Sequence, residues 1–238
     1  MARSKGWRSI DVRVALALVY TAAVLTAMEY WYLPNRVMAR LSNIHDPIWV
    51  PRPSLEAGLT WAGACIIGFL AIPLFLTLIV HRDKPSSIGF STTGFLRHVW
   101  VYLGLYAVMA PVIWLASQRP DFQSSYPFVK SATQSWDLFL RWEAAYVAQF
   151  FALEAFFRGY LLFTLEKRIG WNAIFVMTVP YCMIHWHKPP LEAFGAIIAG
   201  VILGGLALRY RSWLGGALLH ALVAMTMDGL AAHRAGLF

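Results

Sequence analysis

Long apolar segments separated by short polar segments dominate the sequence. Seven such segments cover roughly residues 14–33, 57–80, 98–117, 136–165, 171–187, 191–210 and 213–232. A helix that crosses a bilayer needs about 20 mostly apolar residues. The pattern therefore predicts an all-α polytopic membrane protein with about seven transmembrane helices.

The polar stretches between these segments are short, and the longest of them cover 34–56 and 118–135. Neither is long enough to separate two independently folded domains. We therefore expect a single integral membrane domain, in which residues 1–135 form an N-terminal region of three spans. Residues 136–232 hold most of the ionisable side chains found inside apolar segments, so we expect them to form the functional core.

The composition agrees with a membrane protein. Hydrophobic residues make up 59% of the chain and charged residues only 13%, against about 45–50% and about 25% in ordinary soluble domains. This composition excludes a disordered, collagen-like or coiled-coil chain and argues against a soluble globule. Cys65 and Cys182 both lie inside apolar segments, so we interpret them as small buried hydrophobic residues and not as a disulfide.

The formal net charge is +8, and the basic residues lie in short gaps between apolar segments. This placement favours contact with a lipid bilayer and argues against nucleic acid as a partner. With the N-terminus inside, the cytoplasmic segments hold 11 Lys and Arg residues and the outer segments hold 7, which predicts a cytoplasmic N-terminus. The first apolar segment follows Arg3, Lys5, Arg8 and Arg13, and we expect it to be a retained anchor.

Ionisable side chains inside a membrane cost free energy, so each needs a structural or chemical reason. The fourth apolar segment carries Glu143, Glu154 and Arg158. At 100° per residue these three side chains fall on one stripe of a helix, and Glu154 can pair with Arg158 one turn away. Two interpretations stay open: a buried ion pair that sets helix register, or a carboxylate held ionised by the arginine and turned into a cavity.

The fifth apolar segment ends with two histidines. His185 and His187 are separated by about 200° around a helix, so they do not face one site. His185 lies one turn after Tyr181 and deeper in the span, so we expect it to face the site. We expect His187 to lie at the membrane interface. Pro180 inside this segment removes a backbone hydrogen bond and predicts a kink.

Further ionisable residues lie in the last two apolar segments. Glu192 falls in the first turn of the sixth, where the helix dipole favours a carboxylate and Lys188 is available as an i, i+4 partner. His220 lies early in the seventh segment, and Asp228 follows eight residues later. That separation is about 12 Å along a helix, so we do not expect Asp228 to bond His220 directly.

One glutamate, two histidines and one arginine therefore lie on three separate spans. Glu154 flanked by His185 and His220 in a dry cavity can deprotonate a water molecule and pass the proton on. Two histidines and one glutamate also make a zinc ligand set, but the H-E-x-x-H spacing of zinc proteases is absent. We therefore expect hydrolysis without a metal or other cofactor.

Three sequence marks within residues 136–232 resemble the CPBP family of membrane-embedded CAAX-protease and bacteriocin-processing proteins. The family shows E-E-x-x-x-R, then an aromatic residue four positions before a His, then H-x-x-x-N. Here these marks read Leu153-Glu154-Ala-Phe-Phe-Arg158, Tyr181-Cys-Met-Ile-His185 and His220-Ala-Leu-Val-Ala224. The stretch from Arg209 to Trp213 also looks like the family's Arg-x-Ser-x-Trp connection.

Two positions depart from the family's marks. Leu153 replaces the first glutamate, the residue usually given the water-activating role, and Ala224 replaces the asparagine. Either Glu154 takes over as the base, or Glu143 does, or the protein is not a protease. Glu192 and Asp228 are candidates for replacement partners.

The resemblance implies a glutamate-type intramembrane endopeptidase of the bacterial inner membrane. Its expected substrate is a membrane-embedded protein or peptide. Glu154 would act as general base, Arg158 would orient it, and His185 and His220 would position water and stabilise the oxyanion. Glu143, Lys188, Glu192 and Asp228 would support the site. The alternatives are a non-catalytic protein of the same fold, acting as an immunity, scaffold or peptide-binding partner, and a small proton-linked transporter.

Overall fold

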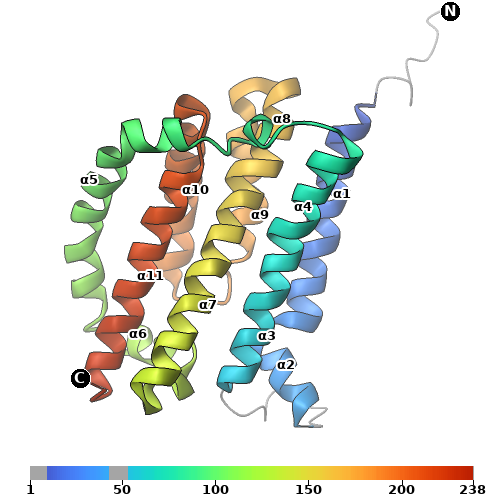
Figure 1. Ribbon diagram of the computed structural model, residues 1–238. Helices are drawn as coiled ribbons and strands as arrows, with labels where there is room; N and C mark the ends of the chain where they lie inside the picture. The colour runs from blue at the N-terminus through green and yellow to red at the C-terminus, as the bar shows by residue number, and fades with distance from the viewer. Residues whose placement is uncertain (1–9, 43–52, 238) are drawn as a thin grey trace, which may run out of the picture.

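The computed structural model describes residues 10–42 and 53–237, and these residues form helices and no strands (Figure 1). The elements are α1 (Val12–Ala27), η2 (Met28–Tyr32), α2 (Pro34–Leu41), α3 (Leu55–Cys65), η4 (Ile66–Ala71), α4 (Ile72–Phe75), η5 (Leu76–Val80), η6 (Pro85–Ile88), α5 (Thr92–Ala116), α6 (Pro120–Ser125), η7 (Lys130–Gln134), α7 (Trp136–Glu154), η8 (Ala155–Leu161), α8 (Leu162–Ile169), η9 (Gly170–Asn172), α9 (Ala173–Met183), α10 (Pro190–Tyr210) and α11 (Leu214–Arg234).

Polar side chains mark where several long helices begin. Asp11 accepts hydrogen bonds from the first backbone N–H groups of α1, and Ser54, Ser91 and Ser135 do the same for α3, α5 and α7. These N-caps satisfy donors that have no partner inside the helix. Each cap directly precedes an apolar segment, so short polar signals set the starts of the long helices.

Each of the seven expected apolar segments contains helix. Within residues 10–42 and 53–237, five continuous helices are long and apolar enough to cross a membrane: Val12–Tyr32, Leu55–Val80, Pro85–Ala116, Pro190–Tyr210 and Leu214–Arg234. They confirm an all-α polytopic membrane fold. The helix from Trp136 to Ile169 is long but carries charged residues inside it. The number of seven spans stays a prediction.

The fifth expected span is shorter than the sequence pattern suggests. Its helix α9 has 11 residues, which is about 16 Å of helix against a hydrocarbon core of about 30 Å. Turns follow α9 up to the start of α10 at Pro190. The helix therefore ends inside the bundle, and it delivers His185 and Lys188 there on non-helical backbone.

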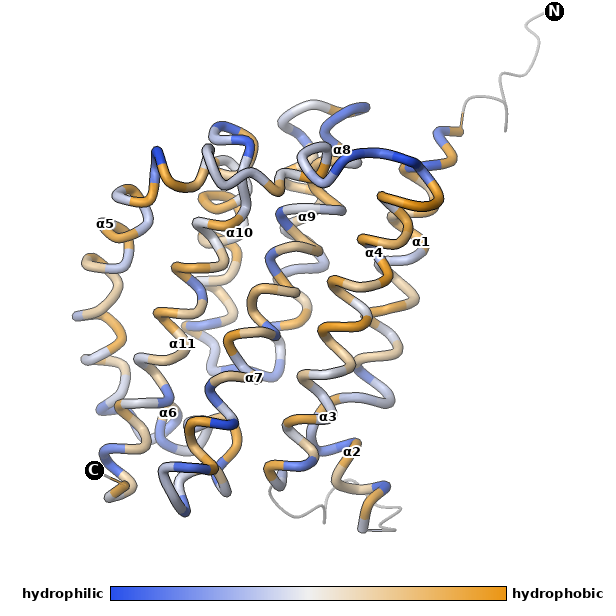
Figure 2. Tube along the Cα trace, viewed as in Figure 1, coloured by the Kyte–Doolittle hydropathy of each residue, from blue (hydrophilic) through white to orange (hydrophobic). Residues whose placement is uncertain are grey.

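The chain passes back and forth between two ends of the bundle, and the start of α1 and the end of α11 lie at opposite ends (Figure 1). Figure 2 shows polar residues gathered toward both ends and apolar residues between them. At the end where α1 begins, residues 10–13, 81–97, 166–172 and 209–213 carry eight Lys and Arg and three Asp and Glu. We call this the basic end. Arg3, Lys5, Arg8 and Arg52, which entered the charge comparison, lie outside the described residues.

The helix formed by α7, η8 and α8 is the centre of the packing. Phe156, Phe157 and Leu161 in its π-helical turn have no exposed surface. Ala17 of α1 and Phe69 of η4 belong to the same buried cluster. The N-terminal helices therefore pack directly against the segment that carries Glu154 and Arg158.

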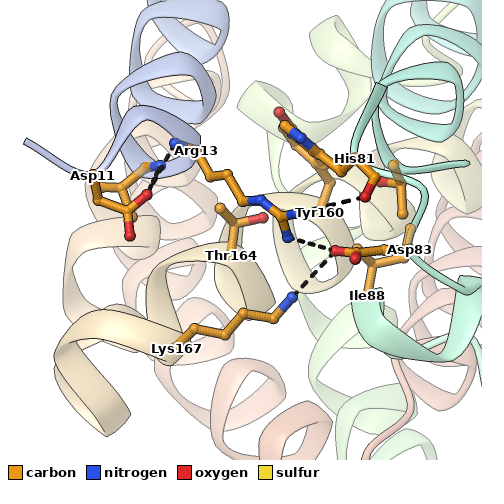
Figure 3. Close-up of a pocket in the computed structure, with 10 residues that line it drawn as sticks. Asp11, Arg13, His81, Asp83, Ile88, Tyr160, Thr164 and Lys167 are labelled. Carbon is orange, nitrogen blue, oxygen red and sulfur yellow. Dashed lines mark hydrogen bonds and ion pairs between the residues drawn. The ribbon is translucent and has the colours of Figure 1, made fainter. Parts of the chain in front are cut away.

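Ion pairs join the start of α1 to other segments of the basic end (Figure 3). Asp83 Oδ2 accepts from Arg13 Nη1 at 2.9 Å and lies 3.6 Å from Lys167 Nζ. Arg168 pairs with Asp11, the residue that caps α1, and this hydrogen bond lowers the pKa of Asp11. Residues from three distant parts of the chain thus meet in one charged network.

Candidate active site

Glu154, the last residue of α7, is contacted by side chains from two elements. It has no exposed surface. Its Oε1 accepts hydrogen bonds from Arg158 Nη1 at 2.7 Å and from His220 Nδ1 of α11 at 3.0 Å. The expected Glu154–Arg158 pair is therefore present, and it extends to a histidine 66 positions along the chain.

The bond to Glu154 sets the tautomer of His220. A carboxylate oxygen only accepts hydrogen bonds, so the Nδ1 atom of His220 carries the proton. In the neutral ring, Nε2 then holds the lone pair. The His220 side chain is 15% exposed whereas that of Glu154 is fully enclosed. The histidine is therefore the member of the pair that faces accessible space.

Arg158 lies in the π-helical turn η8, and such turns are frequent at functional sites. The arginine is fully buried, and its Cζ lies 3.7 Å from the centre of the Tyr181 ring of α9. A buried cation–π contact of this kind is worth about 2 kcal/mol. Tyr181 therefore fixes the position of Arg158, which in turn bonds Glu154.

His185 reaches the site through Tyr181. Its Nδ1 donates to the Tyr181 carbonyl oxygen at 2.9 Å, and the two rings lie 4.8 Å apart edge to face. The Tyr181 ring is also 6.4 Å from the His220 ring. Both histidines therefore flank one tyrosine, although only His220 bonds Glu154 directly. His187 lies apart on the surface, where its Nε2 is 3.1 Å from Glu29.

Gly216 leaves room for the carboxylate. A Cβ atom at this position of α11 would lie 2.7 Å from Glu154 Oε2. Gly216 precedes His220 by one helical turn, so both residues face α7. The close approach of the two helices at this glycine allows the bond between His220 and Glu154 to form.

The four supporting residues expected from the sequence form a second polar cluster, farther from the basic end. Asp228 is fully buried and accepts from Trp142 Nε1 at 2.8 Å and from the Phe128 backbone N–H at 3.1 Å. The Glu143 carboxyl group interacts with Asp228. Glu143 lies on the same face of α7 as Tyr146. Glu143 therefore faces Asp228 and not Glu154.

Lys188 and Glu192 complete this cluster through Tyr126. Lys188 Nζ donates to the Tyr126 hydroxyl oxygen at 3.2 Å, and that hydroxyl donates to Glu192 Oε2 at 2.6 Å. The Lys188 ammonium also lies 4.1 Å from the centre of the Phe128 ring. Residues 126–134, which we call the strap, are thereby held against α7, α10 and α11.

A row of neighbouring aromatic rings joins the Glu154 site to the second polar cluster. Trp142 lies 4.7 Å from Tyr146, Tyr146 lies 4.6 Å from Phe150, and Phe150 lies 4.3 Å from His220. Ala224 packs into the same buried group. An aromatic wall thus fills the space between the strap and the His220 ring.

Comparison with known proteins identifies the region that carries these residues. Residues 135–226, about two fifths of the chain, match the family model described as type II CAAX prenyl endopeptidase Rce1-like. By this similarity we call these residues the Rce1-like core. No curated protein and no solved structure matches the chain. The match agrees with the CPBP resemblance, and the apolar helices support an integral membrane protein.

The two departures from the family's marks lie in apolar surroundings within the Rce1-like core. Leu153 is 4% exposed and belongs to the same cluster as Phe156 and Phe157. Ala224 belongs to the aromatic cluster of Trp142, Tyr146 and Phe150. Apolar packing therefore occupies both positions, and the surviving polar set is Glu154, Arg158, His185 and His220.

The sequence did not single out several residues that shape the Rce1-like core. The position of Gly216, one turn before His220, was a usable signal because a glycine there permits close helix contact. Tyr126 and Phe128 gave no such signal, because they act from a loop about 100 positions before Asp228. Among the described residues, no group of three or more His, Cys, Asp or Glu side chains is placed to hold a metal ion.

Proposed function

We propose that this protein hydrolyses a peptide bond in a membrane-bound protein or peptide and that Glu154 and His220 act as a unit. The carrying observation is the 3.0 Å hydrogen bond from His220 Nδ1 to Glu154 Oε1, in a pair whose carboxylate is fully buried. The family match supports the class of reaction.

In this proposal His220 takes the proton from water. Its Nε2 accepts the proton while Nδ1 stays bonded to Glu154, whose negative charge stabilises the imidazolium that forms. The hydroxide attacks the peptide carbonyl, and His220 then returns the proton to the leaving amine. Glu154 has no exposed surface, so we assign it the positioning of His220 in place of the direct general-base role expected from the sequence.

Arg158 and His185 complete the proposed chemistry. The Arg158 guanidinium pairs with the Glu154 carboxylate at 2.7 Å and adds positive charge near the oxyanion that develops. His185 donates from Nδ1 to the Tyr181 carbonyl, so its Nε2 is an acceptor that can orient the attacking water. The reaction uses water as the only co-reactant.

The test is cleavage of membrane-anchored peptide substrates in proteoliposomes by folded variants. We expect His220→Ala and Glu154→Gln to lose about 10²–10⁴-fold in turnover, the usual range for removing general acid–base catalysis, and His185→Ala to lose less. His98→Ala is the matched control, because His98 Nδ1 bonds the Gly94 carbonyl at 3.0 Å in the same i, i−4 arrangement as His185. Unchanged turnover in the first two variants would overturn the proposal and favour a non-catalytic binding protein.

We also propose that the basic end faces the cytoplasm of a bacterial cell, with the protein in the inner membrane. The excess of Lys and Arg over Asp and Glu at this end supports that orientation. A C-terminal alkaline phosphatase fusion should then be active and a C-terminal green fluorescent protein fusion dark, because α11 ends at the opposite end. The reverse pattern would contradict this orientation.

A further inference from the structure

An apolar cavity of about 330 Å³ lies beside the helix that carries Glu154. Its walls come from the second span (Phe69 to Leu78), from the segment Pro85–Phe90, and from Phe151, Ala155 and Trp213. Every lining residue is apolar. The cavity is distinct from the site of the His220 pair, because neither Glu154 nor His220 lines it. Phe151 and Ala155, which do line it, lie about 60° and about 100° around the helix from Glu154.

Physical chemistry restricts what can fill this cavity. By liquid volume it would hold about ten water molecules, but apolar cavities without hydrogen-bonding partners stay dry. An empty cavity of this size costs free energy because its lining atoms lose contacts. The second span is one of the helices apolar enough to cross a membrane, and Leu78 and Phe90 at the cavity are 39% and 42% exposed. The surrounding medium there is lipid hydrocarbon.

Positive charge lies next to the cavity at the basic end. Lys84 directly precedes Pro85, which lines the cavity, and Arg82 lies three positions before Pro85; both basic residues are exposed. In the part of the chain that the structure describes, neither forms an ion pair, whereas nearby Arg13 and Lys167 both contact Asp83. Figure 2 shows this connection between η5 and α5 as a strongly polar segment. Such a rim complements the phosphate of an anionic lipid.

We propose that one acyl chain of an anionic phospholipid of the bilayer occupies this cavity and that Arg82 and Lys84 bind its phosphate. The bound chain would complete the packing of Phe151 and Ala155 against the second span, and so support the helix on which Glu154 lies. The proposal requires a bilayer but does not depend on peptide hydrolysis.

Trp213 provides a direct probe, because it lines the cavity and yet is only 2% exposed. The full chain is placed in nanodiscs of phosphatidylglycerol with or without bromine atoms on the acyl chains. The Trp213 signal is the difference between the wild type and Trp213→Phe. We expect bromine to quench most of this signal, because the chain that carries it contacts the indole ring.

A larger side chain that fills the cavity should remove the quenching of Trp213 by bromine. We expect Leu74→Phe to restore most of the Trp213 emission in brominated lipid. If that variant does not fold, Leu78→Phe takes its place. Leu115→Phe is the matched control, since Leu115 is 61% exposed on α5 and lies outside the cavity. Arg82→Gln with Lys84→Gln should shift half-maximal quenching to a higher fraction of phosphatidylglycerol in phosphatidylcholine. The proposal would be overturned if bromine did not quench the Trp213 emission, or if it quenched the emission of the filled variants as strongly as that of the wild type.

Discussion

The side chain of Glu154 is enclosed by an arginine one turn away, a histidine from another helix and a glycine that leaves it space. Its Oε1 receives both hydrogen bonds, and Oε2 lies against Gly216. A helical i, i+4 pair is local, so the partnership with Arg158 follows from the sequence. The partnership with His220 depends on how α11 packs on α7, which residue spacing does not encode.

At the residue scale we predict that Gly216→Ala lowers turnover about tenfold or more, since displacements of about 1 Å at a catalytic group have such effects. The new Cβ would lie 2.7 Å from Glu154 Oε2, so the carboxylate must move away from His220. Turnover in proteoliposomes measures the effect. Gly229→Ala, on the same helix with no atom within 4 Å of the new Cβ, should leave turnover unchanged. Equal loss in both variants would show that helix composition, and not contact with Glu154, is responsible.

At the scale of elements, the helices follow the apolar pattern closely, with one informative difference. The expected span over 171–187 is α-helical only from Ala173 to Met183. Hydropathy reports that a segment is apolar, but it does not report where helical hydrogen bonding stops. Pro189 and Pro190 restrict the backbone just after His187, and the turns before them place Lys188 in the second polar cluster.

The strap is the element whose attachment is most directly testable. Asp228→Asn leaves one of its two donors, Trp142 Nε1 or the Phe128 N–H, facing an amide NH₂ group. We expect a loss of about 1–3 kcal/mol in the free energy of unfolding, the usual cost of an unsatisfied buried polar group. Thermal unfolding in detergent micelles measures it.

Asp137→Asn is the control for this prediction. Asp137 forms an i, i+4 pair with Arg141 on the surface of α7, with both side chains more than 60% exposed. Such a pair contributes about 0.3–0.5 kcal/mol. A similar loss in both variants would show that Asp228 does not hold the strap through its buried hydrogen bonds.

At the scale of the whole molecule, ion pairs and aromatic packing join the N-terminal helices to the Rce1-like core. Asp83→Asn removes the acceptor shared by Arg13 and Lys167. We predict a lower melting temperature, by an amount equivalent to about 1 kcal/mol for a partly exposed charge network. The difference from wild type should shrink in 1 M salt, because exposed charges are screened within about 3 Å there.

Arg141→Gln tests whether any lost ion pair has the same effect. It removes a pair within one helix, so it should leave the melting temperature nearly unchanged at low salt. If the melting temperature of Asp83→Asn stayed equally far below that of the wild type in high salt, an electrostatic link between α1 and α8 would be contradicted.

The sequence by itself determined the properties that depend on neighbouring residues. These are the apolar segments, their helical character, the concentration of ionisable residues after position 135, and the Glu154–Arg158 pair. Only the tertiary structure decided which face of each helix meets which other helix. That packing brings His220 to Glu154, turns Glu143 toward Asp228 and lays the strap across α7 and α11. The reason is physical. Hydrophobicity and helical periodicity act over a few residues, and many helix faces have similar apolar patterns. Contacts between distant helices depend instead on side-chain shape and on which buried polar groups find partners.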